Sequence, residues 1–123
     1  MLIWNVTPAA AVTPTPSIGG ISADGYLNRA FQEVNIGNYQ SGIKDYTEAV
    51  RLKPDSAEAY NNRGVAYADL KLHHKAIDDY TEAIRLKSDY ALAYENRART
   101  YEYLGNHSRA AQDLRKAKEL RGH

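Results

Sequence analysis

The sequence predicts an all-α protein, a right-handed α-solenoid of three antiparallel helix-turn-helix repeats. An eight-residue pattern recurs at a spacing of 34 residues and begins at Ala23, Ala57 and Ala91. Within each copy, apolar and small side chains recur at steps of three and four residues, the spacing that places them on one face of an α-helix. Because a two-helix unit cannot bury its apolar stripe alone, the copies are expected to stack into a continuous array.

Each copy divides into two helical segments separated by a turn. In the second copy, one face of the first segment carries Tyr60, Gly64, Tyr67 and Leu70, and one face of the second carries Ala76, Ile77, Tyr80, Ala83 and Ile84. The turns are expected near 37–38, 71–72 and 105–106, where Gly or Asn supplies cap and turn geometry in the first and third copies. Pro54 with Asp55 and Ser56 ends the first copy and caps the next helix.

The chain is expected to consist of a tail and three repeats. Residues 1–22 form the tail, and residues 23–56, 57–90 and 91–123 form the repeats. The tail carries no charged side chain and three prolines, so it is expected to be extended, either disordered or docked as a short apolar peptide. A trimmed leader or a remnant added for expression is a further interpretation of this segment. In the last helix Ala111, Arg115 and Lys118 replace apolar residues and threonine of the earlier copies, so this helix is expected to act as the array's own cap.

Composition excludes several classes of function. Lys and Arg total 16 against 15 Asp and Glu, a balance that gives no support to nucleic-acid binding. The chain has no cysteine, which excludes thiol enzymes and disulfide scaffolds. No apolar run approaches the ~20 residues that a membrane helix needs. We therefore expect a soluble protein without membrane insertion, with no signal peptide recognised and with the cytoplasm as the favoured compartment.

No pattern of catalytic or metal-ligating residues is found in the sequence. His73 and His74 are adjacent and point in different directions on a helix, and no histidine pair has the spacing of a metal site. Neither a phosphate-binding glycine loop nor a nucleophile-elbow pattern is present. We therefore expect a protein that is not an enzyme and that uses no cofactor and no metal.

Three arginines and three aspartates occupy equivalent places in the copies. Arg29, Arg63 and Arg97 are each followed 16 residues later by Asp45, Asp79 and Asp113. In the first copy the two residues lie eight positions before and eight after the turn at Gly37, which places them at the same height on facing helices. We expect a structural ion pair in each copy. The alternative is an arginine that reaches a ligand carboxylate.

The repeats resemble the tetratricopeptide repeat over about four-fifths of the chain. The period of 34 matches that pattern, as do the small residues Ala30, Gly64 and Ala98, the later alanines Ala49, Ala83 and Ala117, the tyrosines Tyr46, Tyr67, Tyr80 and Tyr101, and Pro54. Three positions depart from this pattern: Gly42 replaces the usual Ala, Glu33 replaces the usual Tyr and Ser88 replaces the usual Pro. The departures put the local packing of the first copy in question and leave the fold unchanged.

The resemblance implies a non-catalytic protein-interaction module, in which the first helix of each repeat lines a concave groove for an extended peptide or a partner helix. By this resemblance, the groove positions are Leu27, Asn28, Phe31, Val34, Asn61, Asn62, Val65, Leu92, Glu95, Asn96 and Arg99. One subfamily clamps the C-terminal carboxylates of chaperone tails with Lys, Arg and two Asn. Only Asn62 matches that set, so no such clamp is expected here.

The expected partner is a protein or peptide of neutral or mixed apolar and polar character, whose identity the sequence leaves open. The alternative is a self-assembling scaffold unit. Such a homo-oligomer would form through the open ends of the array, or through a tail that docks into its own or a neighbouring groove.

Overall fold

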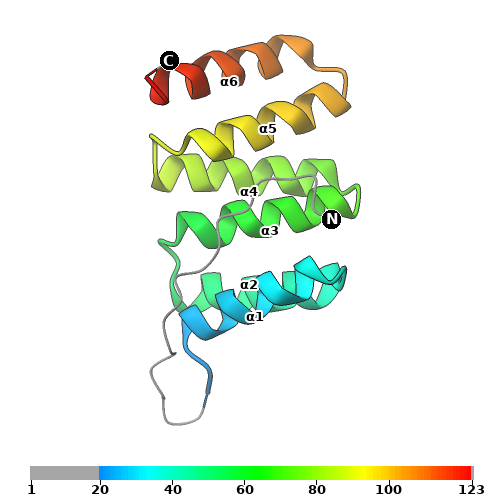
Figure 1. Ribbon diagram of the computed structural model, residues 1–123, viewed down its shortest axis with the longest axis vertical. Helices are drawn as coiled ribbons and strands as arrows, with labels where there is room; N and C mark the ends of the chain where they lie inside the picture. Colours follow the sequence, from blue (N-terminus) through cyan, green and yellow to red (C-terminus); the bar gives the residue numbers. More distant parts are fainter. Residues whose placement is uncertain (1–19, 123) are drawn as a thin grey trace.

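The computed structural model describes residues 20–122, which fold as a stack of six α-helices (Figure 1). The helices are α1 (Ala23–Asn35), α2 (Tyr39–Leu52), α3 (Ala57–Asp69), α4 (His73–Leu86), α5 (Ala91–Tyr103) and α6 (His107–Leu120). None of these six helices is long and apolar enough to cross a membrane. The expectations for residues 1–19 concern a segment outside the described residues.

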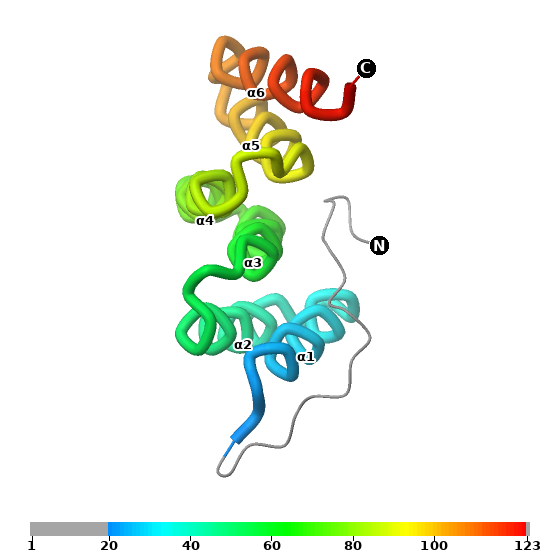
Figure 2. The backbone as a smooth tube through the Cα atoms, turned by 90° about the vertical axis from the view of Figure 1, so that its left-hand side faces the viewer, coloured from blue at the N-terminus to red at the C-terminus, as the bar shows by residue number. Residues whose placement is uncertain are grey.

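The helices pack as three hairpins that follow one another along the stack. α1 packs on α2, α3 on α4 and α5 on α6, while α2 contacts α3 and α4 contacts α5. α1 also contacts α3, and α3 contacts α5, whereas the described helices α2, α4 and α6 do not contact one another. The first helices of the repeats therefore approach one another on one side of the array, which we call the inner face (Figure 2). The predicted all-α solenoid of three helical hairpins is confirmed.

Local side chains and backbone conformations determine where the helices begin and end. The hydroxyl oxygens of Ser22 and Ser56 accept hydrogen bonds from the amides of Gly25 and Ala59, at 3.1 and 3.2 Å, and so cap α1 and α3. Gly37 and Gly105 have positive φ in the turns after α1 and α5. Lys71 has a φ of 65° in the equivalent turn of the second repeat, a conformation that favours glycine.

Two glycines permit the close packing of the helices within a hairpin. A Cβ atom on Gly42 would lie 2.5 Å from Cγ2 of Val34, and one on Gly64 would lie 2.7 Å from Cε1 of Tyr80. Both neighbours are buried, so neither has free space to move into. Gly42 is thus the residue that lets Val34 of α1 pack against α2, which accounts for its departure from the repeat pattern.

The second helices carry one large side chain per repeat toward the following hairpin. Tyr46 and Tyr80 occupy equivalent positions in α2 and α4 and have no exposed surface. Leu114 occupies that position in α6 and is 50% exposed, because no further hairpin follows in the described residues. Arg115 and Lys118 are exposed beside it. The end of the array therefore combines an exposed leucine with charged residues.

Candidate functional site: the inner face of α1, α3 and α5

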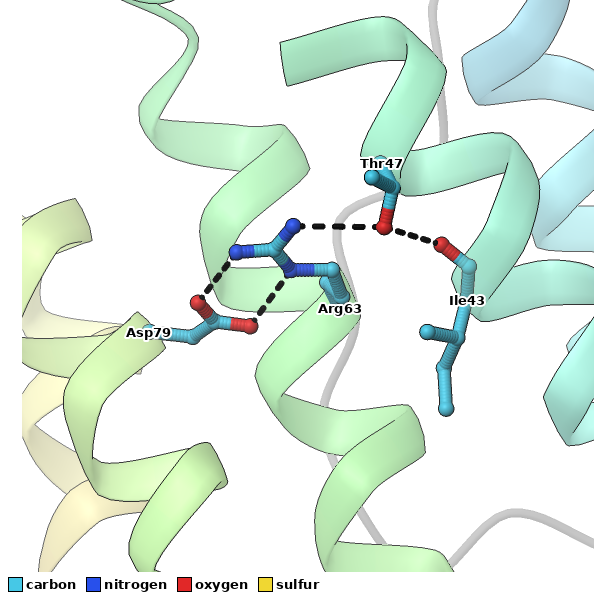
Figure 3. A network of polar contacts seen from close by, with 4 residues as sticks. All are labelled: Ile43, Thr47, Arg63 and Asp79. Carbon is cyan, nitrogen blue, oxygen red and sulfur yellow. Dashed lines mark hydrogen bonds and ion pairs between the residues drawn. The ribbon is translucent and has the colours of Figure 1, made fainter. Parts of the chain in front are cut away.

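An ion-pair network behind the inner face fixes the orientation of its helices. Arg63 donates two hydrogen bonds to Asp79, 2.8 Å from Nε to Oδ2 and 2.7 Å from Nη2 to Oδ1. Its third nitrogen, Nη1, donates to the hydroxyl of Thr47 in the preceding repeat at 3.3 Å, and that hydroxyl donates to the carbonyl of Ile43 at 2.7 Å (Figure 3). Arg63 thus joins α3 to α4 and also to α2.

The same arrangement recurs one repeat later. Arg97 donates to Asp113 at 2.8 and 2.7 Å and to the hydroxyl of Thr81 at 3.1 Å. Each of the two arginines also lies close to two tyrosine rings. The guanidinium carbon of Arg63 is 5.4 and 5.7 Å from the ring centroids of Tyr60 and Tyr67, and that of Arg97 is 5.6 and 5.9 Å from those of Tyr94 and Tyr101. Such stacking holds the planar guanidinium in place.

The first repeat has a weaker version of the network. Arg29 donates to Asp45 at 2.7 and 2.9 Å, but no threonine of a preceding repeat is present in the described residues to bind its third nitrogen. Glu33 stands where the later repeats have the second tyrosine ring. The Arg29 side chain is consequently 50% exposed, against 16% for Arg63 and 18% for Arg97.

Hydrogen bonding and burial act in opposite directions on the charges of the buried pairs. The hydrogen bonds that Arg63 donates to Asp79 raise the pKa of Arg63, and those that Arg97 donates to Asp113 raise the pKa of Arg97. Burial raises the pKa of Asp79, because it penalises the carboxylate more than Arg63 favours it. A ligand carboxylate would have to displace the aspartate to reach either arginine, so the geometry assigns these groups to packing.

Three asparagines connect α3 and α5 beneath the inner face. Nδ2 of Asn61 donates to Oδ1 of Asn62 at 3.2 Å, and Nδ2 of Asn96 donates to Oδ1 of Asn61 at 3.0 Å. All three side chains are buried, with at most 1% exposed. We call this set the amide ladder. Buried amides of this kind specify packing because each unsatisfied group is costly.

Six of the predicted groove residues are buried, which corrects the expectation that they offer contact area to a partner. They are Leu27, Val34, Asn61, Asn62, Val65 and Asn96. Leu27 and Val34 belong to the core cluster of the first repeat, and Val65 packs in a cluster with Tyr80. The asparagines form the amide ladder. The family resemblance that assigned these residues to a groove carries no information on how deeply each side chain is buried, and the groove itself stays a prediction.

The other five predicted groove residues reach the surface. Asn28, Phe31, Leu92 and Glu95 are partly exposed, and Arg99 is exposed. They come from α1 and α5, at either side of α3. The central part of the inner face, around Val65, is therefore buried, whereas the parts on α1 and α5 are open.

Two shallow hollows lie beside this face. The first has a volume of about 360 Å³ and lies at one edge of the inner face, between the starts of α1 and α3 and the ends of α2 and α4. Its lining includes Asp24, Leu27, Ser56, Ala57 and Glu58. The second, of about 350 Å³, is lined by Glu95, Ala98, Arg99, Glu102 and Leu114. Leu114 was not predicted to line a site, although its alignment with the buried Tyr46 and Tyr80 marks it as a side chain that a neighbour could cover.

Glu95 at the second hollow is held by a residue from the end of the chain. Arg121 donates to its carboxylate at 2.7 and 3.0 Å, and this contact was not predicted either. The negative charge of Glu95 on the inner face is thereby compensated.

Profiles of the tetratricopeptide repeat match three segments of the sequence, residues 33–71, 57–90 and 91–123. Together these segments cover 33–123, and three helical hairpins pack along the same stretch and the residues before it. The chain belongs to the tetratricopeptide repeat family. The profiles begin within α1, and the structure completes this first tetratricopeptide repeat.

Solved structures with the same fold include other tetratricopeptide proteins. MamA has 29% identity and a TM-score of 0.80, and the match covers 82% of this chain and 59% of that one. The second such domain of Spaghetti (RPAP3), bound to the HSP90 peptide SRMEEVD, has 27% identity and a TM-score of 0.78, covering 80% of this chain and 92% of that one. A comparison with curated protein sequences gives no match.

A complex of the TPR2B domain of yeast Sti1 with pHsp70 shares the fold, with 24% identity, a TM-score of 0.78 and coverage of 80% of this chain and 78% of that one. This tetratricopeptide chain spans 59% of the length of the MamA chain that it matches. The family and the fold make the chain a protein-interaction module.

Proposed function

We propose that the chain binds a neutral, extended peptide along its inner face, without catalysing a reaction. The observation that carries the proposal is the presence of a partly exposed apolar residue on each of the two helices beside α3, Phe31 on α1 and Leu92 on α5. Aromatic and aliphatic anchors around a small number of polar groups are typical of peptide grooves. The charge of Glu95 is already paired with Arg121, so it does not select for a charged ligand.

The ligand is expected to be extended. Every residue of an extended peptide presents a backbone donor and acceptor, and the partly exposed amide of Asn28 offers both kinds of partner. The hollow beside Leu114 gives one place for an apolar side chain of the ligand, whereas the hollow at the starts of α1 and α3 is lined mostly by charged residues. The resemblance to the peptide-bound domain of Spaghetti supports this mode of binding.

A clamp for acidic C-terminal tails is not part of the proposal. Two of the positions that would supply clamp cations hold Leu27 and Asn96, which are buried, and a third holds Leu92. The position for the first clamp asparagine holds Phe31. We therefore expect the peptide SRMEEVD, which binds the Spaghetti domain, to bind this chain poorly.

The alternative function, a scaffold that grows by end-to-end stacking, is disfavoured by charge. In the inner junctions a threonine, Thr47 or Thr81, accepts from the arginine of the next repeat. At the end of the array Arg115 occupies that position, and a stacked second copy would present its exposed Arg29 there. Two like charges at close range oppose this assembly.

Fluorescence anisotropy with labelled peptides tests the proposal. The probes are SRMEEVD with a free carboxylate and a blocked, uncharged peptide of Leu, Ile, Asn and Val. The neutral peptide should bind saturably, and Phe31→Ala and Leu92→Gln should weaken it, whereas Ile36→Ala should not, because Ile36 is exposed in the turn after α1. Tighter binding of SRMEEVD than of the neutral peptide would refute the proposed ligand class.

A further inference from the structure

We propose that residues 1–19 of this chain dock on its own inner face and compete with the peptide partner for it. The inference rests on the proposed function, since it names a first occupant of the same surface. It is carried by the position, the length and the chemistry of that segment relative to the described residues.

The segment joins the array at the edge of the inner face. Gly20 and Ile21 are exposed, and Ser22 caps the start of α1. The hollow lined by Asp24 and Leu27 of α1 and by Ala57 and Glu58 of α3 lies at the same edge. A chain that leaves α1 here is therefore already beside the surface.

The length of the segment is sufficient to cross the face. Nineteen extended residues reach up to about 60 Å. α1 contacts α3 and α3 contacts α5, and packed helix axes lie about 8–10 Å apart, so the three helices of the face span roughly 20 Å. The tail can therefore pass α1 and α3 and still place its first residues at α5.

The chemistry of the tail matches that of the surface. Residues 1–6 read Met-Leu-Ile-Trp-Asn-Val, with five apolar side chains and one amide, and no residue of 1–19 has a charged side chain. The inner face offers the partly exposed apolar side chains of Phe31 and Leu92. The prolines at 8, 14 and 16 favour an extended backbone, which lowers the entropy lost on docking.

Attachment gives the tail an advantage over a free peptide. A ligand on a short linker has an effective concentration in the millimolar range. A partner peptide must therefore displace the tail, and its apparent affinity is reduced by the fraction of molecules whose face is occupied.

The only tryptophan, Trp4, lies in the tail and reports its environment in the intact chain. Docking predicts that its emission is blue-shifted relative to N-acetyltryptophanamide and that its acrylamide quenching constant is several-fold lower. Both values should stay constant over a hundredfold range of protein concentration. Phe31→Ala should shift the emission to the red, and the matched control Ile36→Ala should leave it unchanged; if Phe31→Ala loses helical circular dichroism, Leu92→Gln replaces it.

The other outcomes overturn the inference in distinct ways. A Trp4 with the emission and quenching of the free indole excludes docking, and a peptide that still binds the inner face would then leave the proposed function intact. Protection that appears only at high protein concentration identifies the face of a second copy as the site. A blue shift that Ile36→Ala abolishes but neither Phe31→Ala nor Leu92→Gln affects places the tail on another surface.

Discussion

Replacing Arg63 by methionine should destabilise the array far more than the same replacement of Arg29. Methionine keeps much of the apolar stem and removes the charge. Asp79, whose side chain is only 7% exposed, then remains without the arginine, and Arg63 itself was 16% exposed. Breaking a buried ion pair by removing one partner costs about 3–5 kcal/mol, and we expect Arg63→Met to lie near 3 kcal/mol because the site is not fully closed.

Arg29 provides the matched control in the same fold. Its side chain is 50% exposed, it has no threonine partner from a preceding repeat among the described residues, and it stacks on one tyrosine, Tyr26. The carboxylate of Asp45 is itself only 10% exposed, but water reaches it beside the half-exposed Arg29. Arg29→Met should therefore cost about 1 kcal/mol, the upper end of the 0.2–1 kcal/mol that exposed ion pairs contribute. The two variants should differ by roughly 2 kcal/mol although the pairs are chemically identical.

Urea unfolding followed by circular dichroism measures both free energies of unfolding. The double variant Arg63→Met with Asp79→Leu should recover much of the loss, since it removes the unpaired carboxylate. Equal losses for Arg29→Met and Arg63→Met would refute the argument that burial decides the effect. Loss of peptide binding by Arg63→Met at unchanged stability would instead support the alternative in which the arginine contacts a ligand.

Three further perturbations follow from individual sites. Lys71→Gly should stabilise the chain by about 0.5–1 kcal/mol in urea unfolding, because glycine adopts the φ of 65° without strain; a loss would contradict this. Glu33→Tyr should add about 0.5–1 kcal/mol by giving Arg29 the second ring that Arg63 has, and an unchanged urea midpoint would count against the stacking. Burial raises the pKa of Tyr46 and of Tyr80, so the stability they contribute is complete below about pH 10 and falls as the pH rises further. Tyr80→Phe should reduce this alkaline loss, and an unaltered pH dependence would show that the hydroxyl is not the cause.

The repeat architecture was predictable because its signals are local and periodic. The spacing of Ala57 and Ala91, the serine caps and the turn glycines each act over a few residues, and they agree with one another. The pairing of Arg63 with Asp79 was also accessible, since the two positions lie symmetrically about a turn. Thr47 was not recognised as a partner, because its contact joins two repeats and depends on how they stack.

The functional surface was only partly predictable for the same physical reason. The family resemblance assigned Phe31 and Leu92 to the groove; both are partly exposed, and their contact with a partner stays a prediction. Periodicity determines only which side of a helix a residue lies on. It does not determine depth, which depends on the neighbouring helix, so Val34 and Val65 were assigned to the groove although they are buried. The contact between Arg121 and Glu95 joins residues 26 positions apart in sequence and has no periodic signal.

Backbone amide chemical shifts during a titration with the neutral peptide test the central claim most directly. If the inner face binds an extended peptide, the perturbed amides should cluster on α1, α3 and α5, with the strongest changes near Phe31 and Leu92. The signals of α2, α4 and α6 facing away from that surface should remain unchanged. Perturbations confined to α2, α4 and α6, or to the end formed by Arg115 and Lys118, would contradict the account.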